Sequence, residues 1–316
     1  MMKKVFIDGA QGTTGLRIHE RLGERNDVEL LVLPEDKRKD PAAIEEALNA
    51  CDIAFLCLPD DAAREAVAMV HNPDTVILDT STAHRTAQGW AYGFPELSSA
   101  HREEIVHGRR IAVPGCHASG FIALIHPLVA TGLLRKDTAL SCFSLTGYSG
   151  GGKKMIAQYE GQGRDHLLSA PRQYGLTQQH KHLKEMTVIS GIGIAPAFCP
   201  VVADFYSGME VTVPLFRKDL TKDAGLQTIR ELYRDTYISG LVQVVESDDE
   251  QGFLSAMTYA GTDGMWVSVY GNEDRMLLTA RYDNLGKGAS GAAVQCMNLV
   301  LGVDEKTGLV TERADG

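Results

Sequence analysis

The sequence predicts an α/β plus α+β protein, with a parallel α/β domain first and a mixed, mainly antiparallel sheet domain after it. Its 316 residues correspond to about two domains, because ~150 residues are typical of one domain. In residues 1–115 short apolar runs alternate with amphipathic stretches, which indicates strand–helix alternation and a parallel sheet. Beyond Gly120 the strand-like segments alternate apolar and polar residues, which favours an antiparallel sheet.

The first domain contains five candidate strands and three candidate helices. Ile53–Leu58 is apolar throughout and is followed by Pro59, as expected for a strand that is buried on both faces. The strands are expected at Val5–Ile7, Val28–Leu33, Ile53–Leu58, Val76–Leu78 and Arg110–Val113. The helices are expected at Thr13–Gly23, Ala42–Ala50 and Ala62–Val70.

The second domain is expected to begin with a helix at Phe121–Leu134 and to contain another at Leu226–Tyr237. Its alternating segments are Ala139–Leu145, Met186–Ile194, Glu210–Leu215, Leu241–Val245, Met265–Tyr270 and Met276–Tyr282. The last helix, Ala289–Leu301, carries its small apolar residues on one stripe and should return to the first domain. The predicted domains are therefore 1–116 completed by 286–316, and 117–285.

The composition excludes several classes of protein. With 44% hydrophobic and 23% charged residues, the chain is neither disordered nor fibrous. A formal net charge of −10 lacks the positive surface that nucleic acid or an anionic membrane requires. No uninterrupted apolar stretch reaches ~18 residues, and the N-terminus lacks the apolar core of a signal peptide. We therefore expect a cytoplasmic protein that acts on small molecules.

A glycine-rich turn joins the first strand to the first helix. Its sequence contains Gly9, Gly12, Thr13, Thr14 and Gly15 in the pattern GxxGxxG, a relative of the dinucleotide fingerprint. Glycine lets the backbone approach a pyrophosphate, which then lies on the helix N-terminus. A plain strand-to-helix turn is the alternative, but the position after the first strand favours a dinucleotide.

The end of the second strand carries both acidic and basic residues. Glu35 and Asp36 match the acid that binds a ribose 2′-hydroxyl, whereas Lys37, Arg38 and Lys39 favour a 2′-phosphate. The residues alone therefore leave NAD and NADP open. A solvated loop is a further interpretation of the same segment.

Cys116 differs from the other five cysteines. It lies between a strand and a helix in Pro114-Gly115-Cys116-His117, and a helix N-terminus stabilises a thiolate. A small buried cysteine is the alternative, and it fits the others well: Cys51, Cys57, Cys142, Cys199 and Cys296. The absence of any CxxC pair indicates a reducing compartment.

A polar cluster brings His180, His182 and Glu185 within six residues. A general acid–base histidine that partners the thiol is favoured over a metal site, because no other His/Cys cluster completes a ligand set. A solvated loop is the third interpretation. No metal is expected.

Two further segments could hold an anion or be ordinary loops. Ser149-Gly150-Gly151-Gly152-Lys153-Lys154 offers backbone N–H groups and positive charge. Thr80-Ser81-Thr82-Ala83-His84-Arg85 follows a predicted strand, and open α/β sheets bind ligands at that end of their strands.

Taken together, these motifs resemble the N-acetyl-γ-glutamyl-phosphate reductase family of the semialdehyde dehydrogenase superfamily. The resemblance covers nearly the whole chain in order, and two of its stretches are the most specific: Tyr92–Leu97 and Asp283–Gly291. The remaining matches are Gly9–Gly15, Asp79–Arg85, Pro114–Cys116, Gly147–Lys154 and His180–Glu185. The chain resembles the shorter of the family's two length classes.

The resemblance implies an NADP(H)-binding Rossmann domain, an α+β domain with homodimer or homotetramer contacts, and reduction of an acyl phosphate through a cysteine thioester. Cys116 would be the nucleophile, and His180 or His182 the acid–base group. The implied cofactor-binding residues are Gly9, Gly12, Thr13, Thr14, Gly15, Lys37, Arg38, Ser81, Ser149, Gly150, Gly151 and Asn284. The implied substrate-binding residues are Arg85, Tyr148 and Glu185.

The chain departs from the family pattern at three places. His117-Ala118 stands where an aromatic residue and a proline often follow the cysteine, Ala83-His84-Arg85 replaces Asp-Phe-Arg, and Leu183 replaces a proline. Two other functions stay open. One is a sister dehydrogenase for aspartyl phosphate or a carrier-bound aminoadipyl phosphate, and the other is a dinucleotide-sensing protein without catalysis.

Overall fold

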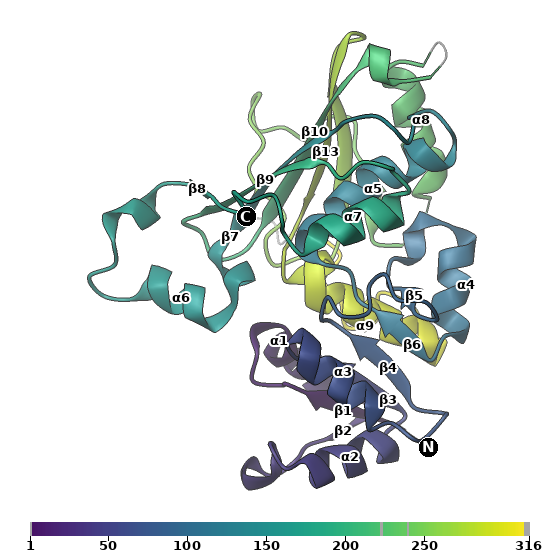
Figure 1. Ribbon diagram of the computed structural model, residues 1–316, viewed down its shortest axis with the longest axis vertical. Helices are drawn as coiled ribbons and strands as arrows, with labels where there is room; N and C mark the ends of the chain where they lie inside the picture. Colours follow the sequence, from purple (N-terminus) through teal and green to yellow (C-terminus); the bar gives the residue numbers. More distant parts are fainter. Residues whose placement is uncertain (1, 222–223, 239, 313–316) are drawn as a thin grey trace. The chain divides into compact units, whose positions relative to one another are not determined.

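The computed structural model describes residues 2–221, 224–238 and 240–312, which form two compact units (Figure 1). Unit 1 comprises Met1–Pro95, Ser99–Pro114 and Ala289–Leu309. Unit 2 comprises Glu96–Ser98, Gly115–Gly288 and Val310–Gly316. The predicted C-terminal segment 286–316 is thus divided between the units, and its residues 313–316 lie outside the described part of the chain.

Unit 1 is built on a six-stranded sheet whose neighbouring strands are all parallel. The strand order is β2-β1-β3-β4-β6-β5. In chain order these strands are β1 (Lys3–Asp8), β2 (Val28–Leu31), β3 (Ile53–Leu56), β4 (Val76–Asp79), β5 (Ala91–Tyr92) and β6 (Arg110–Ala112). Because the order reverses beside β1, the carboxyl end of β1 lies at a switch point, where such sheets bind ligands.

Helices cover both faces of this sheet, which explains its continuously apolar strands. Alternate residues of β3 enter different cores: Ile53 and Phe55 pack with α1 (Thr13–Gly23), α4 (Ser99–His107) and α9 (Gly291–Leu301). Ala54 and Leu56 pack with α2 (Pro41–Ala50) and α3 (Asp60–Ala68). The C-terminal helix α9 therefore belongs to the core of unit 1.

Unit 2 contains a seven-stranded mixed sheet with the order β11-β12-β13-β10-β7-β9-β8. The β11–β12 and β7–β9 pairs are parallel and the other pairs antiparallel. The strands are β7 (Ser141–Gly147), β8 (Arg172–Gln173), β9 (Ala197–Ala203), β10 (Met209–Phe216), β11 (Val242–Val244), β12 (Met265–Gly271) and β13 (Arg275–Tyr282). These two sheets confirm the predicted fold class.

Three helices lie on one side of this second sheet, as Figure 1 shows: α5 (Cys116–Ala130), α7 (His182–Ser190) and α8 (Leu226–Thr236). Helix α5 is buried along most of its length and packs on β10 and β13. Helix α6 (Gly152–Glu160) follows the glycine-rich segment after β7. Short 3-10 turns lie at Glu35–Lys37, Pro95–Leu97, Tyr148–Gly151, His166–Ser169 and Arg217–Asp219, and a π-helical turn at Gly286–Ser290.

The strand predicted at Met186–Ile194 is wrong, because Met186–Ser190 is the C-terminal half of α7 and residues 191–194 form no strand. Its buried residues recur at the three- and four-residue spacing of a helix: His182, Glu185, Met186 and Ser190. The left-handed Gly191, with φ of +79°, then ends the helix. The alternation of apolar and polar residues in this segment had favoured a strand. Among the described helices, none is both long and apolar enough to cross a membrane.

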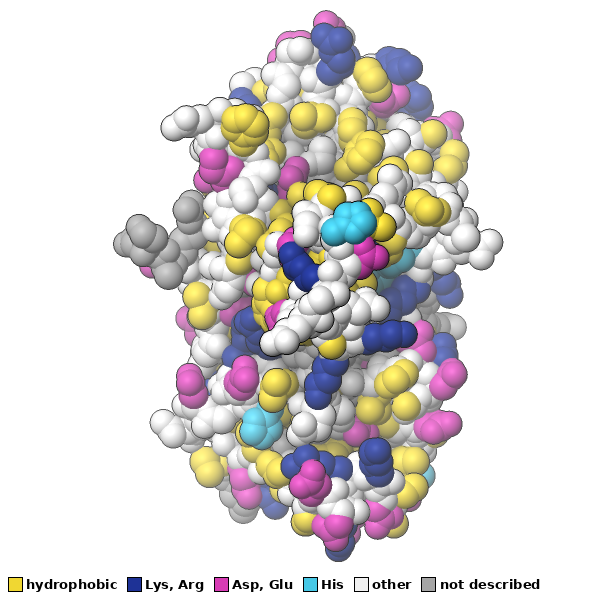
Figure 2. Space-filling view, turned by 90° about the vertical axis from the view of Figure 1, so that its left-hand side faces the viewer, with side chains coloured by type: hydrophobic (Ala, Val, Ile, Leu, Met, Phe, Trp, Pro, Cys, Tyr) yellow, Lys and Arg dark blue, Asp and Glu magenta, His cyan; other side chains and the backbone are white. Residues whose placement is uncertain are grey.

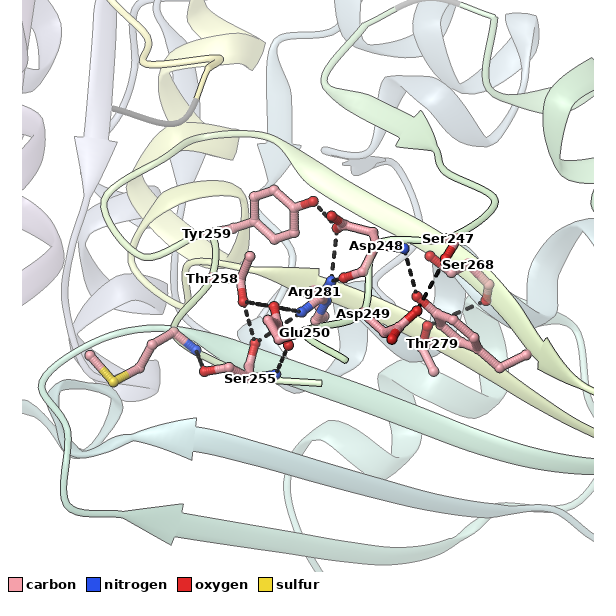
Figure 3. A network of polar contacts seen from close by, with 12 residues as sticks. Ser247, Asp248, Asp249, Glu250, Ser255, Thr258, Tyr259, Ser268, Thr279 and Arg281 are labelled. Carbon is pink, nitrogen blue, oxygen red and sulfur yellow. Dashed lines mark hydrogen bonds and ion pairs between the residues drawn. The ribbon is translucent and has the colours of Figure 1, made fainter. Parts of the chain in front are cut away.

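The segment between β11 and β12 folds against β13 around one buried arginine (Figure 3). Arg281 is 3% exposed and donates to Glu250 Oε1 at 2.7 Å and to Asp248 Oδ2 at 2.8 Å. Tyr259 bonds Asp248 and stacks on Trp266 with ring centroids 3.7 Å apart. Burial raises the pKa of Glu250, but the hydrogen bonds from Thr258, Arg281 and the Ser255 backbone outweigh it and bring the pKa to about 2.

We expect this segment to give unit 2 a measurable sensitivity to acid. The folded pKa of Glu250, about 2, lies below its unfolded value, so its stabilisation is present above about pH 4.3 and is lost as the pH falls through 2. Glu250→Gln should therefore lower the free energy of unfolding at pH 7, and the difference from the wild type should shrink below pH 4. Urea unfolding at several pH values measures it. Glu46→Gln, on an exposed position of α2, is the control; an equal, pH-independent loss in both variants would contradict the prediction.

Candidate active site

In unit 1 a cavity of about 660 Å³ lies at the carboxyl ends of β1 and β2. Its walls come from residues 6–11, 30–33, 35, 36, 38 and 39, together with Leu16, His19 and Leu58. Two positions of the turn that leads into α1, Gly9 and Gly15, can hold only glycine. Gly9 has φ of +78°, and a Cβ there would lie 2.3 Å from the Cys57 carbonyl oxygen; a Cβ on Gly15 would lie 2.5 Å from the Gly9 carbonyl oxygen. The backbone therefore wraps tightly at the N-terminus of α1, as a pyrophosphate site requires.

Both signs of charge line this cavity at the segment after β2. Glu35 and Asp36 lie on its wall, as do Arg38 and Lys39. Lys37 is exposed and is not part of the wall. The structure thus separates Arg38 and Lys39 from their neighbour Lys37, which the sequence had grouped with them.

The segment after β4 is tied together by a buried carboxylate. Asp79, with no exposed surface, accepts hydrogen bonds from the Ser81 backbone N–H at 2.9 Å and the Ser81 hydroxyl at 2.7 Å, and its Oδ2 lies 2.6 Å from His84 Nδ1. Arg85 is 8% exposed and donates to the carbonyls of Val113 and Thr80, both at 2.9 Å. These bonds give Ser81 and Arg85 a structural task at this strand end, beside the ligand-binding roles expected from sequence.

In unit 2 Cys116 is the first residue of α5 and is partly exposed. The preceding residue, Gly115, donates its N–H to Glu185 Oε1 at 2.8 Å. Tyr282 donates its hydroxyl to the Cys116 carbonyl at 2.5 Å and accepts from the Gly120 N–H at 3.0 Å. Gly288 packs so closely that a Cβ there would lie 3.0 Å from the Cys116 Cβ. Three separate segments therefore hold the start of this helix.

A cluster of aromatic and imidazole rings lies next to Cys116 in the chain fold. The ring of His117 is 5.8 Å from that of His180 and 5.6 Å from that of His182, and the last two are 4.8 Å apart. Phe198 packs edge-on against His117 and His180. The structure thus brings Cys116, His180, His182 and Glu185 into one region of unit 2, as the sequence grouping expects.

The two predicted histidines differ in their surroundings. His180 is partly exposed, and its Nδ1 accepts the His182 backbone N–H at 3.2 Å. Burial and the charge of Lys181 lower the pKa of His180. His182 is 5% exposed and is the first residue of α7. His180 is therefore the more accessible of the two imidazoles.

A glutamine positions the loop that carries His180. Gln178 adopts a left-handed φ of 55° and binds both backbone groups of Phe198: its Oε1 accepts the N–H at 2.8 Å and its Nε2 donates to the carbonyl at 2.7 Å. The Gln178 side chain thus forms hydrogen bonds with the backbone of β9, as a neighbouring strand would. Nothing in the local sequence marks this residue.

The predicted anion-binding segment Ser149–Lys154, which follows β7, is partly helical. Ser149 is 1% exposed and accepts from Asn284 Nδ2 at 3.0 Å, while Asn284 Oδ1 accepts the Gly208 N–H at 2.9 Å. A Cβ on Gly150 would lie 3.5 Å from the same amide nitrogen, so Gly150 adjoins Asn284, and Gly151 directly precedes α6. Tyr148, expected to bind substrate, stacks on Tyr159 at 4.7 Å and donates to Glu160 at 3.2 Å.

The sequence did not single out four residues of the Cys116 region as functional: His117, Ser144, Tyr174 and Tyr282. His117 lies 2.7 Å from Ser144 Oγ through Nδ1 and 2.6 Å from the Tyr174 hydroxyl through Nε2. Tyr282 holds the Cys116 carbonyl. Only His117 carried a signal, since it departs from the aromatic residue typical of the resembled family. No group of three His, Cys, Asp or Glu side chains among the described residues is arranged to hold a metal ion.

Comparisons with known proteins agree with this geometry. Residues 4–105 match the NAD binding domain of the semialdehyde dehydrogenases, and residues 116–284 match their dimerisation domain. The chain is 47% identical over 311 residues to the N-acetyl-gamma-glutamyl-phosphate reductase of Chelativorans sp. (strain BNC1), covering 95% of this chain and 99% of that protein. It is 44% identical over 321 residues to the protein of the same name from Trichormus variabilis, covering 97% and 99%.

Solved structures show the same fold at low sequence identity. Aspartate semialdehyde dehydrogenase II from Vibrio cholerae superimposes with a TM-score of 0.74 at 18% identity, covering 95% of this chain and 98% of that one. Aspartate semialdehyde dehydrogenase from Candida albicans, solved with NADP, gives a TM-score of 0.66 at 14% identity, covering 95% and 99%.

Proposed function

This chain belongs to the N-acetyl-γ-glutamyl-phosphate reductase family of semialdehyde dehydrogenases, and from that premise we propose that it reduces N-acetyl-γ-glutamyl phosphate to N-acetylglutamate semialdehyde with NADPH, releasing phosphate, in arginine biosynthesis. The observation that carries the proposal is the partly exposed Cys116 at the first residue of α5, whose neighbour His117 packs against the rings of His180 and His182. The resemblance to this family is confirmed by the relatives.

Cys116 acts as the nucleophile. Its thiolate attacks the carbonyl carbon of the acyl phosphate, and the tetrahedral intermediate expels phosphate to leave a thioester on the sulfur. Helix N-termini favour a thiolate, and Glu185, Tyr282 and Gly288 fix the helix start that carries it. Phosphate leaves without protonation, so this step places little demand on an acid.

The next step needs hydride and a proton. NADPH, when bound, supplies the hydride that converts the thioester into a thiohemiacetal. The residues of unit 1 fit this cofactor, because the Gly9–Gly15 turn opens α1 beside a 660 Å³ cavity that carries Arg38 and Lys39. His180 protonates the thiohemiacetal oxygen and then removes that proton when the C–S bond breaks and the aldehyde leaves.

The substrate assignment is tested in the reverse direction. Phosphate-dependent reduction of NADP⁺ should be fast with N-acetylglutamate semialdehyde and slow with aspartate semialdehyde. Comparable kcat/KM values for the two aldehydes would overturn the assignment to this substrate. A complete lack of reduction with either aldehyde, alongside normal cofactor binding, would favour a dinucleotide-sensing protein.

We predict that Cys116→Ser binds cofactor normally and loses nearly all turnover, since a serine hydroxyl is not ionised at neutral pH. Burial raises the pKa of Cys51 and of Cys57 to about 12, which leaves both as neutral thiols. Cys199→Ala, which removes a partly exposed thiol, is the matched control and should keep full activity. Steady-state assays and cofactor titration measure both; more than a few per cent of activity in Cys116→Ser would remove this thiol from the mechanism.

Arg38 and Lys37 form a matched pair for testing the cofactor. Arg38 lines the cavity and Lys37 does not, so Arg38→Ala should raise the KM for NADPH about tenfold or more and leave that for NADH nearly unchanged. Lys37→Ala should change neither. Initial rates with both cofactors provide the readout. Equal losses for NADPH and NADH in Arg38→Ala would argue against a 2′-phosphate contact.

We expect His180→Asn to lower the rate of hydride transfer by roughly 10²–10⁴-fold, the scale of one positioned acid–base group, and to slow thioester formation much less. The lowered pKa of His180 places its titration below pH 6.5 in the wild type, and that limb of the pH–rate profile should vanish. His182→Asn should act mainly on KM. Single-turnover kinetics separate the steps. If neither variant changes the rate by more than about threefold, the proton transfer lies elsewhere.

We also propose that the protein is located in the cytoplasm. We further propose a homo-oligomer that pairs through the outer face of the sheet in unit 2, the face turned away from α5, α7 and α8. In adjacent strands this face carries Phe143, Pro214, Tyr270 and Leu277, and Phe143 is 49% exposed and Leu277 43%. Figure 2 views the molecule from the side opposite α5, α7 and α8, and hydrophobic side chains are frequent in its upper part. Large exposed apolar side chains on a sheet face are typical of an interface. Sedimentation of Leu277→Asp beside the wild type tests this pairing.

A further inference from the structure

A buried polar chain in unit 2 has no part in the mechanism above. It runs from Ser144 on β7 through His117 on α5 to Tyr174 after β8. Ser144 and His117 are 1% and 2% exposed, and the two contacts measure 2.7 Å and 2.6 Å. The chain therefore joins the residue directly after the nucleophile to a phenol that lies 57 residues further along the sequence.

His117 carries a single ring proton at neutral pH. Burial, with a smaller contribution from His180, lowers the pKa of His117 to about 3. A neutral imidazole donates through one nitrogen and accepts through the other, so two arrangements are open. In the first, Tyr174 donates to Nε2 and Nδ1 donates to Ser144. In the second, Ser144 donates to Nδ1, Nε2 donates to the Tyr174 oxygen, and the phenolic proton is released to point elsewhere.

Negative charge at Cys116 favours the second arrangement, because that arrangement frees the phenolic proton of Tyr174. Burial raises the pKa of Tyr174, and the charge of Cys116 raises it further, so the two groups interact and Tyr174 keeps its proton. Cys116 also raises the pKa of Tyr282, but that hydroxyl already donates to the Cys116 carbonyl and accepts from Gly120. Tyr174 is thus the phenol whose proton can turn toward new negative charge.

The other ionisable groups around the start of α5 are accounted for. Glu185 on α7 accepts from the Gly115 N–H, and His182 begins the same helix. His180 lies on the loop before it, with its ring 6.0 Å from that of Tyr174. Lys287, in the turn next to Gly288, binds both oxygens of the buried Glu96 at 2.8 Å. None of these groups bonds the His117 imidazole nitrogens, which lie against Ser144 and Tyr174.

We propose that Ser144 and His117 are positioning residues that turn the Tyr174 hydroxyl into a hydrogen-bond donor for negative charge at Cys116, first the thiolate and then the oxygen of the thiohemiacetal. The charge on the thiohemiacetal oxygen rests on the proposed function, whereas the charge on the thiolate does not. The ring proton of His117 exchanges from Nδ1 to Nε2, while the hydroxyls of Ser144 and Tyr174 rotate and each keeps one proton, so the number of protons and the net charge are unchanged.

The experiment measures alkylation of Cys116 by iodoacetamide as a function of pH, with the labelled peptide quantified by mass spectrometry. Tyr174→Phe should move the midpoint of the profile to higher pH and slow alkylation at pH 7 by about threefold to tenfold, the range of one hydrogen bond. Ser144→Ala should shift it in the same direction by less. His117→Phe combined with Tyr174→Phe should add little to Tyr174→Phe alone, because both act through one hydroxyl.

Tyr233→Phe is the matched control. Its hydroxyl is also buried and donates to a backbone carbonyl, that of Leu124, so this variant should lose thermal stability and keep the wild-type profile. An unshifted profile in both Tyr174→Phe and Ser144→Ala would overturn the proposal, as would equal shifts in Tyr174→Phe and Tyr233→Phe. Alkylation requires no substrate, so a shifted profile in an enzyme that rejects N-acetylglutamate semialdehyde would overturn the proposed function alone.

Discussion

The chemistry of unit 2 depends on how the first turn of α5 is held. The backbone around Cys116 is bound on three sides: by the carboxylate of Glu185 at the preceding residue, by the hydroxyl of Tyr282 at the carbonyl, and by the close approach of Gly288. These contacts come from α7, β13 and the π-helical turn, so segments that are far apart in the sequence meet around Cys116. A reacting atom needs this, because small displacements of a nucleophile cost large factors in rate.

Much of this structure follows from residue patterns. The apolar strands of unit 1 predict a sheet with two covered faces, since Ile53, Ala54, Phe55 and Leu56 leave no polar side to expose. Cys116 stood out because the sequence placed it after a strand and at the start of a helix, whereas the other five cysteines fit apolar runs or helices. The pattern failed in the second half, where apolar–polar alternation over Met186–Ile194 suggested a strand in place of α7, and Pro200 interrupted the signal of β9.

The residues that support the nucleophile were out of reach of such patterns. Tyr174 is brought to His117 by the pairing of β8 with β9, a register that no local pattern encodes. Gln178 acts through its bonds to Phe198, and a glutamine in a polar loop has no distinguishing neighbours. Long-range pairing determines these contacts, whereas local spacing determines helices and glycine turns. This difference explains why the position of Cys116 at the start of a helix could be predicted and most of the residues that contact this helix start could not.

The surroundings of His117, the residue directly after Cys116, show how a polar ring can be buried beside the nucleophile. A residue at that place is enclosed by α5 and the sheet, and an aromatic ring would fill the space without needing partners. Histidine fills it too, with Phe198 edge-on to its ring, but it adds two polar nitrogens that are costly to bury without hydrogen bonds. Ser144 and Tyr174 meet that requirement, one on each side. Each of the three residues therefore constrains the other two. Without Ser144 or Tyr174 the buried imidazole would lose a hydrogen-bond partner. Without His117 the hydroxyls of Ser144 and Tyr174 would each lose theirs. A substitution at any one of them should be tolerated best when the other two change with it, so this trio is expected to vary as a unit.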